Sequence, residues 1–246
     1  QPSLRWLVPH DLARLQGQTL HALTRRAKYI VARFEQDALL MHLGMSGSFN
    51  LSTYAATTAR RKHDHVELNF DQHQLRYHDP RRFGSILWLH EPRAQSLLAK
   101  LGVEPLDGAF DADYLAQRLN NKSTAIKIAL MDNAVVVGVG NIYATEALFY
   151  TGIHPARPAS TLTLDEITQL VSAVKRILTQ AITLGGSSLR DYVNGQGETG
   201  YFQQTLAAYG RAGQACLQCG TTLDGLRLGQ RASVFCPVCQ PIGKNR

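Results

Sequence analysis

The sequence predicts a multidomain α+β protein: an N-terminal β-sandwich, a helical domain, and a C-terminal β-hairpin that holds a metal. Three observations support this class. Runs rich in β-branched and aromatic residues alternate with turns over roughly the first 90 residues. Helical periodicity with capping residues follows, and the four cysteines cluster near the end. The expected domains span residues 1–105, 106–207 and 208–246.

The composition is that of a folded, basic protein. Hydrophobic residues make up 44% and charged residues 18% of the 246, which excludes a disordered chain. Lys and Arg number 26 against 19 Asp and Glu, giving a net charge of +7, and arginine suits bidentate recognition of phosphates. Because no run of 18 apolar residues and no basic-then-apolar leader occurs, we expect a cytoplasmic, nucleoid-associated protein.

β-strands are expected throughout the first part of the chain. Asp11 can cap a short helix that Gly17 ends, and the strands follow it. Gly-, Asp- and Thr-rich turns separate these strands, a pattern typical of a sandwich or a barrel. The expected strands cover residues 19–25, 27–34, 38–43, 48–51, 65–70, 74–78 and 85–89.

After Pro92 the pattern becomes helical. The clearest helix starts at a capping box of Thr163 and Glu166 and ends at Gly185-Gly186, with apolar residues at helical spacing between them. Shorter helices are expected over residues 94–101, after a cap at Asp111, and after a cap at Ser123 or Thr124.

The cysteines form two pairs with the spacing of zinc ligands. A Cys-x2-Cys turn lets two thiolates face one tetrahedral ion, and the 16 residues between the pairs suffice for a β-hairpin. Two disulfides are the alternative, which the absence of a secretory leader disfavours. We therefore expect one structural Zn²⁺ bound by Cys216, Cys219, Cys236 and Cys239.

The hairpin between the cysteine pairs has few apolar residues, and Asp224-Gly225 is its expected turn. Metal binding must therefore supply most of its folding free energy, on the order of 10 kcal/mol. Beyond Phe202 the only acid is Asp224, so the basic hairpin is a candidate contact for a polyanion. The alternative is a zinc ribbon that serves only stability or protein contact.

A Gly-x-Gly turn is a second candidate for binding an anion. The β-branched run 135–137 opposes helix, and Gly138 and Gly140 then free backbone amides just before a helix that starts near Asn141. The anion would be a phosphate of a nucleic acid. A tight turn between helices, which needs the same glycines, is the alternative.

Two turns in the β-rich part combine arginine with apolar side chains. Met45 lies on a Gly-flanked turn, and Arg81 and Phe83 lie on another. Met and Phe can act as wedges that unstack bases, while Arg fills the space of a displaced nucleotide. Taken singly, each is more often a core residue or a solvated arginine.

Two polar stretches are less specific. Arg25, Arg26 and Lys28 are expected at the start of a strand, where Lys28 could be held against an apolar surface and act as a general acid or base. A solvated charge run is the alternative. His63 and His65 could form a metal-binding arm, although a contact with phosphate or packing explains them equally well.

These motifs resemble those of the formamidopyrimidine-DNA glycosylases, bacterial base-excision repair enzymes of the family that also contains endonuclease VIII. The resemblance covers essentially the whole chain. It implies a β-sandwich, a helix-two-turn-helix domain and a zinc finger in a monomer that binds damaged duplex DNA between its lobes. The matching segments are residues 25–29, 42–48, 62–66, 79–84, 124–127, 138–143, 200–202, 230–232 and the four cysteines.

The resemblance also implies roles for single residues. Met45, Arg81 and Phe83 match the three residues that fill the gap left by an everted base, which favours oxidised purines, such as 8-oxoguanine and formamidopyrimidines, as substrates. Residues 186–201 match a mobile loop that closes over this base. Asn141 and Arg231 would grip the phosphates beside the lesion, His63 and Lys122 would make further DNA contacts, and Lys28 and Arg231 would serve β- and δ-elimination.

The start of the chain departs from this family. The family's nucleophile is an N-terminal proline followed by glutamate, which attacks the deoxyribose anomeric carbon. Here Pro2 lies behind Gln1, so its nitrogen is an amide, and the first glutamate is Glu35. We interpret the chain as lacking its own beginning, rather than as a naturally shortened homologue.

Two functions follow from this departure. The complete protein would be a glycosylase and abasic-site lyase, whereas the alternative is a module that binds distorted DNA without cutting it. We expect the 246-residue chain to bind abasic-site duplex but to form no covalent adduct upon borohydride reduction, because it has no secondary-amine nucleophile. A trapped adduct would show that another amine, Lys28 first, replaces the proline.

Overall fold

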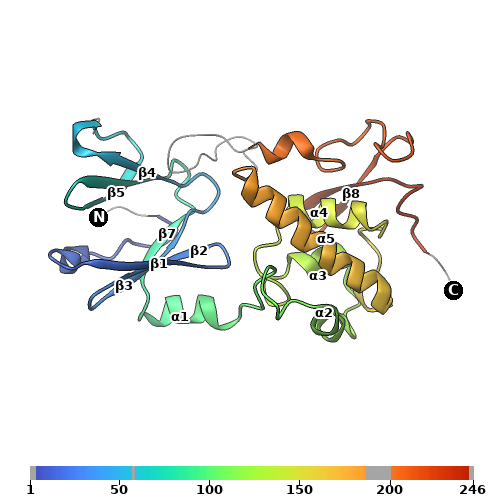
Figure 1. The fold of residues 1–246 in the computed structure, drawn as a ribbon, viewed down its shortest axis with the longest axis horizontal. Coiled ribbons are helices and arrows are strands. Elements are labelled where there is room, and N and C mark those ends of the chain that lie inside the picture. The colour runs from blue at the N-terminus through green and yellow to red at the C-terminus, as the bar shows by residue number, and fades with distance from the viewer. Residues whose placement is uncertain (1–3, 57–58, 187–200, 244–246) are drawn as a thin grey trace. The chain divides into compact units, whose positions relative to one another are not determined.

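The computed structural model of the protein describes residues 4–56, 59–186 and 201–243 (Figure 1). Residues 187–200 of the expected mobile loop lie outside the described part. The chain forms two compact units, one of residues 1–99 with 184–203 and one of residues 100–183 with 204–246. The first unit contains the strands up to β7, and the second contains helices α2 to α5 and the C-terminal hairpin.

The first unit contains a β-sandwich, as the sequence predicts. One sheet has the order β1-β2-β3-β7, the other β4-β6-β5, and all neighbours are antiparallel. Leu39 and Ile86 from the first sheet and Tyr77 from the second are buried in one cluster, so the sheets share a core. The strands are β1 (Leu20–Arg26), β2 (Tyr29–Phe34), β3 (Ala38–His42), β4 (Ser48–Thr53), β5 (Asp64–Asn69), β6 (His73–His78) and β7 (Ser85–Trp88).

Strand β3 is buried on both faces. Leu39 and Met41 point into the core between the sheets, because alternate residues of a strand share a face. Leu40 points the other way and joins a second cluster with Leu87 and Ala94. Ala94 belongs to α1 (Pro92–Ala99), so this helix covers the outer face of the sheet.

Two predictions near the start of this unit are wrong. Asp11 does not cap a helix; its carboxylate accepts a hydrogen bond from the indole of Trp88 at 2.7 Å, and only a 3-10 helix, η1 (Leu12–Leu15), follows it. The strand expected from residue 27 begins at Tyr29. Ala27, at φ 54°, and Lys28 form the two-residue turn between β1 and β2.

The second unit begins with four helices: α2 (Ala112–Leu119), α3 (Ile126–Met131), α4 (Asn141–Tyr150) and α5 (Leu164–Thr183). Helix α4 is buried from Ala144 to Phe149, so its residues there are apolar except Thr145 and Glu146. Helix α5 packs against both α2 and α4. Three more 3-10 helices lie at η2 (Tyr54–Ala56), η3 (Ala159–Thr161) and η4 (Phe202–Thr205).

Two of the three expected helix caps are present. The Asp111 side chain accepts from the Tyr114 amide at 2.8 Å, and Thr163 and Glu166 exchange hydrogen bonds as a capping box. The third prediction is wrong, because α3 has no side-chain cap. Its first amide instead donates to the carbonyl of Arg157 at 2.8 Å, which lies far along the chain.

The C-terminal hairpin consists of β8 (Asp224–Leu228) and β9 (Arg231–Phe235). The expected turn at Asp224-Gly225 is wrong, since Asp224 pairs with Phe235 at the open end of the hairpin. The turn is Gly229-Gln230, with Gly229 at φ 56° in the first central position, where a type II′ turn requires glycine. This register buries Val234 and Phe235.

Candidate metal centre and nucleic-acid interface

The four cysteines converge on one point. All four sulfur atoms lie within 4.8 Å of one another, with 4.0 Å between Cys216 and Cys239 and 3.5 Å between Cys219 and Cys236. These distances exclude disulfides, whose sulfurs are about 2 Å apart. Tetrahedral zinc, with Zn–S bonds of about 2.3 Å, requires sulfurs about 3.8 Å apart. The site therefore fits zinc with four protein ligands and no open position.

The backbone of each knuckle supports its sulfurs. The amide of Gln218 points at the sulfur of Cys216, and that of Cys239 at the sulfur of Cys236, both at 3.4 Å. Such amide contacts orient thiolates and offset their charge, which four sulfurs around one divalent ion require. In each knuckle a backbone amide thus faces the sulfur of the first cysteine, two residues after it in the first knuckle and three residues after it in the second.

Helix α3 holds strand β9 through a buried lysine. The Lys127 ammonium, fully buried, donates to the carbonyl of Ala232 at 2.9 Å and to the Ser233 hydroxyl at 2.8 Å. Among the described residues, no carboxylate pairs with it. Burial alone lowers the pKa of Lys127 to about 8. This contact fixes the backbone next to Arg231, which is exposed at the start of β9.

Helix α4 holds the segment that leads into the first knuckle, and the loop after α4 holds the second knuckle. The buried carboxylate of Glu146 accepts from three consecutive amides, those of Ala207, Ala208 and Tyr209, at 2.7–2.9 Å. The Gln240 side chain joins the Cys236 amide to the carbonyl of Ile153. Lys127, Glu146 and Gln240, which we call the three polar anchors, were missed from the sequence. For the first two, a single charge within an apolar helical run was a visible signal.

The Gly-x-Gly turn precedes α4 as predicted. The valines of residues 135–137 are fully buried, Gly138 has φ 80°, and Gly140 is the N-cap residue. Asn141 is the first residue of the helix, and its buried side-chain oxygen has no hydrogen-bond partner among the described residues. This oxygen is an acceptor and cannot bind a phosphate, so only the side-chain NH2 group of Asn141 and the backbone amides at the positive helix end can donate to one. Lys122, the other predicted contact in this unit, forms an ion pair with Asp132 at 3.7 Å.

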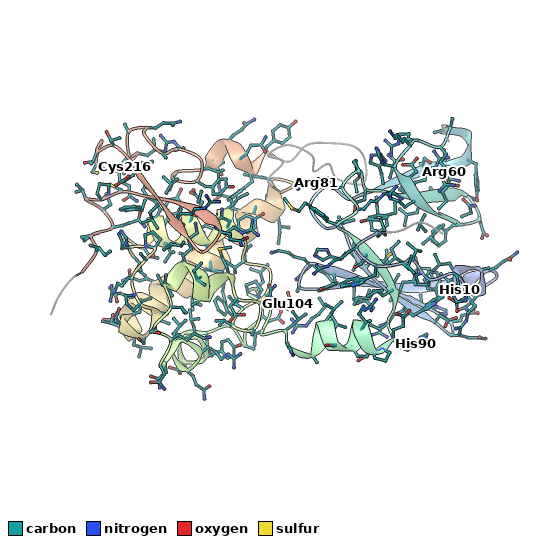
Figure 2. The ribbon with its side chains drawn as sticks, turned by 180° about the vertical axis from the view of Figure 1, so that it is seen from behind. His10, Arg60, Arg81, His90, Glu104 and Cys216 are labelled. Carbon is teal, nitrogen blue, oxygen red and sulfur yellow. The ribbon has the colours of Figure 1, made fainter. Side chains whose placement is uncertain are left out.

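The predicted wedge residues are at the surface. Met45 is 61% and Phe83 is 47% exposed, so neither is a core residue. The Arg81 guanidinium lies over the Phe83 ring, 4.9 Å from its centroid. Figure 2 shows Arg81 projecting from the turn that follows β6. The turn that carries Met45 and the turn that carries Phe83 are close together: a Cβ placed on Gly44 would lie 2.5 Å from the carbonyl carbon of Phe83. The structure therefore brings Met45, Arg81 and Phe83 onto one surface.

Lys28 is exposed in the turn between β1 and β2. Its neighbour Tyr29 pairs across the sheet with His42, with ring centroids 5.0 Å apart. Burial, together with the charges of Lys28 and Arg5, lowers the pKa of His42 below its usual value. His42 is therefore neutral at pH 7 and accepts a hydrogen bond from the Gly44 amide at 2.9 Å.

The two histidines considered as a metal-binding arm do not form one. His65 is buried and bonds to the carbonyl of Asp79 at 2.9 Å. Within the described chain, the four cysteines are the only group of three or more side chains that could hold a metal. His63 lies edge-on to His78, and desolvation lowers its pKa, followed by the charges of Lys62 and its other neighbours. One ring nitrogen of His63 is buried without a partner among the described residues.

A β-sandwich, a helical unit and a hairpin with four convergent cysteines are together typical of the zinc-finger DNA glycosylases. The chain belongs to the formamidopyrimidine-DNA glycosylase family, whose members are repair glycosylases and abasic-site lyases. Three family models match: the formamidopyrimidine-DNA glycosylase N-terminal domain over residues 1–86, its H2TH domain over 101–193, and the zinc finger found in FPG and IleRS over 213–242.

Two relatives of this family are highly similar to the chain. The formamidopyrimidine-DNA glycosylase of Acinetobacter baumannii (strain SDF) is 62% identical over 245 residues, which cover 100% of this chain and 89% of the relative. That of Acinetobacter baylyi is 63% identical over 240 residues, which cover 97% and 88%.

Solved structures share the fold. The MutM (FPG) protein of Thermus thermophilus has a TM-score of 0.85 and 36% identity, covering 95% of this chain and 87% of that one. The complex of Lactococcus lactis Fpg with DNA containing an abasic site has a TM-score of 0.83 and 35% identity, covering 93% and 84%.

The family zinc finger and the sulfur geometry together establish one structural zinc. In the described part of the chain, no helix has the length and apolar character to cross a bilayer.

Removal of the metal should unfold the hairpin but not the β-sandwich, whose core contains no residue of the hairpin. We expect one zinc per chain, released by a strong chelator, and selective proteolysis of residues 208–243 after its release, because the hairpin loses on the order of 10 kcal/mol of folding free energy. The measurements are colorimetric zinc titration and mass spectrometry of the fragments. A hairpin that stays protected after complete zinc loss would contradict this expectation.

Proposed function

We propose that this protein binds duplex DNA containing oxidised purines, such as 8-oxoguanine and formamidopyrimidines, by flipping the damaged base, and that it excises this base and cleaves the abasic site when a secondary-amine nucleophile is present. The observation that carries the proposal is the exposed group of Met45, Arg81 and Phe83. A relative supports it, since Lactococcus lactis Fpg has been solved in complex with Fapy-dG-containing DNA, with a TM-score of 0.82 and 34% identity to this chain.

The wedge performs the step that exposes the lesion. Insertion between bases removes the two large apolar side chains from water, which lowers the free energy. This favourable change offsets the cost of unstacking the bases. Arg81 is already stacked on Phe83, so its guanidinium can enter the vacated space as a planar donor toward the orphaned base.

The phosphates beside the lesion are held by groups of the second unit. Asn141 presents its side-chain amide at the positive end of α4, and Arg231 presents a guanidinium from the zinc hairpin. Lys122 adds a charge that Asp132 partly neutralises. In the β-sandwich, His63 is neutral at pH 7 and contributes one hydrogen bond rather than a charge.

Two cations serve the eliminations that follow base loss. Lys28 is exposed in its turn, where its ammonium can exchange protons with a bound sugar in the β-elimination. Arg231 is beside a phosphate in this proposal and favours its departure in the δ-elimination, since a guanidinium stabilises the leaving anion. His42 is neutral and adds no further full charge beside Lys28.

The working unit in this proposal is a monomer on duplex DNA. The β-sandwich domain (1–105) supplies the wedge, the helix-two-turn-helix domain (106–207) supplies Asn141, and the zinc finger (208–246) supplies Arg231. A cytoplasmic, nucleoid-associated location follows from the DNA substrate and the net charge of +7.

Replacing the wedge should abolish the preference for damaged DNA. We expect Phe83→Ala to reduce the fluorescence increase of 2-aminopurine placed beside an abasic site, because less stacking is broken. The control is Leu51→Ala, which removes an equally exposed apolar side chain from β4. A wild-type chain that binds abasic and undamaged duplex equally would contradict the proposed function. An unchanged Phe83→Ala response would contradict only the role of the wedge.

Removal of Arg231 should weaken DNA binding through the loss of one charge-assisted phosphate contact. We expect Arg231→Ala to cost about 1–3 kcal/mol of binding free energy and to reduce its salt dependence. Arg227→Ala is the matched control, because it removes the same exposed charge from the opposite strand of the hairpin. Binding is measured by fluorescence anisotropy across a salt series. Equal losses in the two variants would reduce Arg231 to a diffuse electrostatic contribution.

A further inference from the structure

A buried carboxylate lies beneath the wedge. Asp79 has no exposed surface and begins the segment 79–84, which we call the Arg81 turn. One of its oxygens accepts from the hydroxyl of Ser46 at 2.7 Å, and the other accepts from the Gly84 amide at 2.8 Å. Ser46 belongs to residues 43–47, the Met45 turn. A single carboxylate therefore bonds to both turns that carry the wedge.

The Ser46 hydroxyl completes a second link between the turns. Because it donates its hydrogen to Asp79, its oxygen is left to accept, and it accepts from the Arg81 amide at 3.2 Å. One oxygen of the Met45 turn thus both donates to and accepts from the Arg81 turn. This bond reaches the backbone of Arg81 itself, one of the three wedge residues.

The Tyr77 hydroxyl also contacts this hydrogen-bond network. Its hydroxyl lies 3.3 Å from the Asp79 carboxylate and 3.3 Å from the carbonyl of His42, at the start of the Met45 turn. Burial, and then the charge of Asp79, raises the pKa of Tyr77 far above its usual value, so the hydroxyl remains a donor at all physiological pH. The carboxylate therefore receives neutral donors from three residues.

The backbones of the two turns approach too closely for a side chain at Gly44 or Gly84. A Cβ on Gly84 would overlap the Tyr77 hydroxyl, and one on Gly44, at φ 68°, would overlap Phe83 and Gly84. Glycine is the only residue that permits this approach. Met45 and Phe83 are therefore exposed at their side chains, while the Arg81 amide is hydrogen-bonded and the Phe83 backbone lies against Gly44.

We propose that Asp79 is a positioning residue that locks the Met45 turn to the Arg81 turn through Ser46, so that Met45, Arg81 and Phe83 meet DNA as one preformed unit. The inference rests on the proposed function of the wedge. Ordering two separate turns upon binding would cost free energy, whereas turns that are locked beforehand avoid this cost. The lock thus favours insertion at a lesion and adds nothing to contact with intact DNA.

The test compares Ser46→Ala and Asp79→Ala with matched controls. Ser46→Ala removes both links between the turns but leaves Asp79 bonded to Gly84 and Tyr77. Its control is Ser52→Ala on β4, and the control for Asp79→Ala is Asp71→Ala, exposed between β5 and β6. The readouts are hydrogen exchange of the turn amides in the free protein, and the ratio of affinities for abasic-site and undamaged duplex.

We expect both variants to exchange the Arg81 amide faster and to lose roughly tenfold or more of the affinity ratio, with affinity for undamaged duplex within about twofold of the wild type. Asp79→Asn should retain part of the ratio, because its amide still bonds Gly84 and can donate to Ser46. If Asp79→Ala does not fold, Ser46→Ala decides alone.

The proposal is overturned if Ser46→Ala keeps the ratio, or if it lowers both affinities equally, which indicates a purely structural role. Failure of the proposed function has a different signature. A wild-type chain without preference for the abasic duplex would remove the function, and the lock with it, whatever the exchange data show.

Discussion

The C-terminal hairpin of the second unit cannot bury enough apolar surface to fold alone and depends on the metal and on contacts with the helices. Its strands contribute few apolar side chains, and its cysteines need a metal to remain close together. The three polar anchors, Lys127, Glu146 and Gln240, provide what an apolar core would otherwise supply. Each is buried, and each is satisfied by backbone or hydroxyl groups at hydrogen-bonding distance. Burying a polar or charged group without hydrogen-bond partners costs free energy. The anchors therefore stabilise the C-terminal segment only when it packs in the position that provides their partners.

Both parts of the proposed DNA contact are built on the same principle. In each unit a buried polar side chain holds the backbone beside an exposed arginine. Lys127 bonds the carbonyl of Ala232, next to Arg231, and the network around Asp79 bonds the amide of Arg81. An exposed arginine on a free loop would lose conformational freedom when it binds DNA. Rigid backbone beneath it confines that loss to the side chain.

The zinc ligands, the strands and the capped helices could be predicted from the sequence because their signals are local. In a Cys-x2-Cys turn or a Thr-x-x-Glu box, the interacting residues lie within a few positions of each other in the sequence. The two cap predictions were wrong because the group concerned bonds a residue far along the chain. The Asp11 carboxylate accepts from Trp88, and the first amide of α3 donates to the carbonyl of Arg157. Asp224-Gly225 and Gly229-Gln230 are both acceptable turns, and only the burial of Phe235 selects the second. Asp79 could not be found, because the Met45 turn that it serves lies more than 30 residues away in a register that sequence alone does not provide.

The contact of Glu146 with three consecutive amides bears on the evolution of the zinc finger. A carboxylate on α4 holds the segment that leads into the first knuckle, so the finger's folded state includes a charge that another part of the gene encodes. The finger of this chain therefore depends on a residue outside it. Residues 208–246 moved to a new protein would leave the amides of Ala208 and Tyr209 without their acceptor, and a substitution at position 146 would affect the metal site without changing a cysteine.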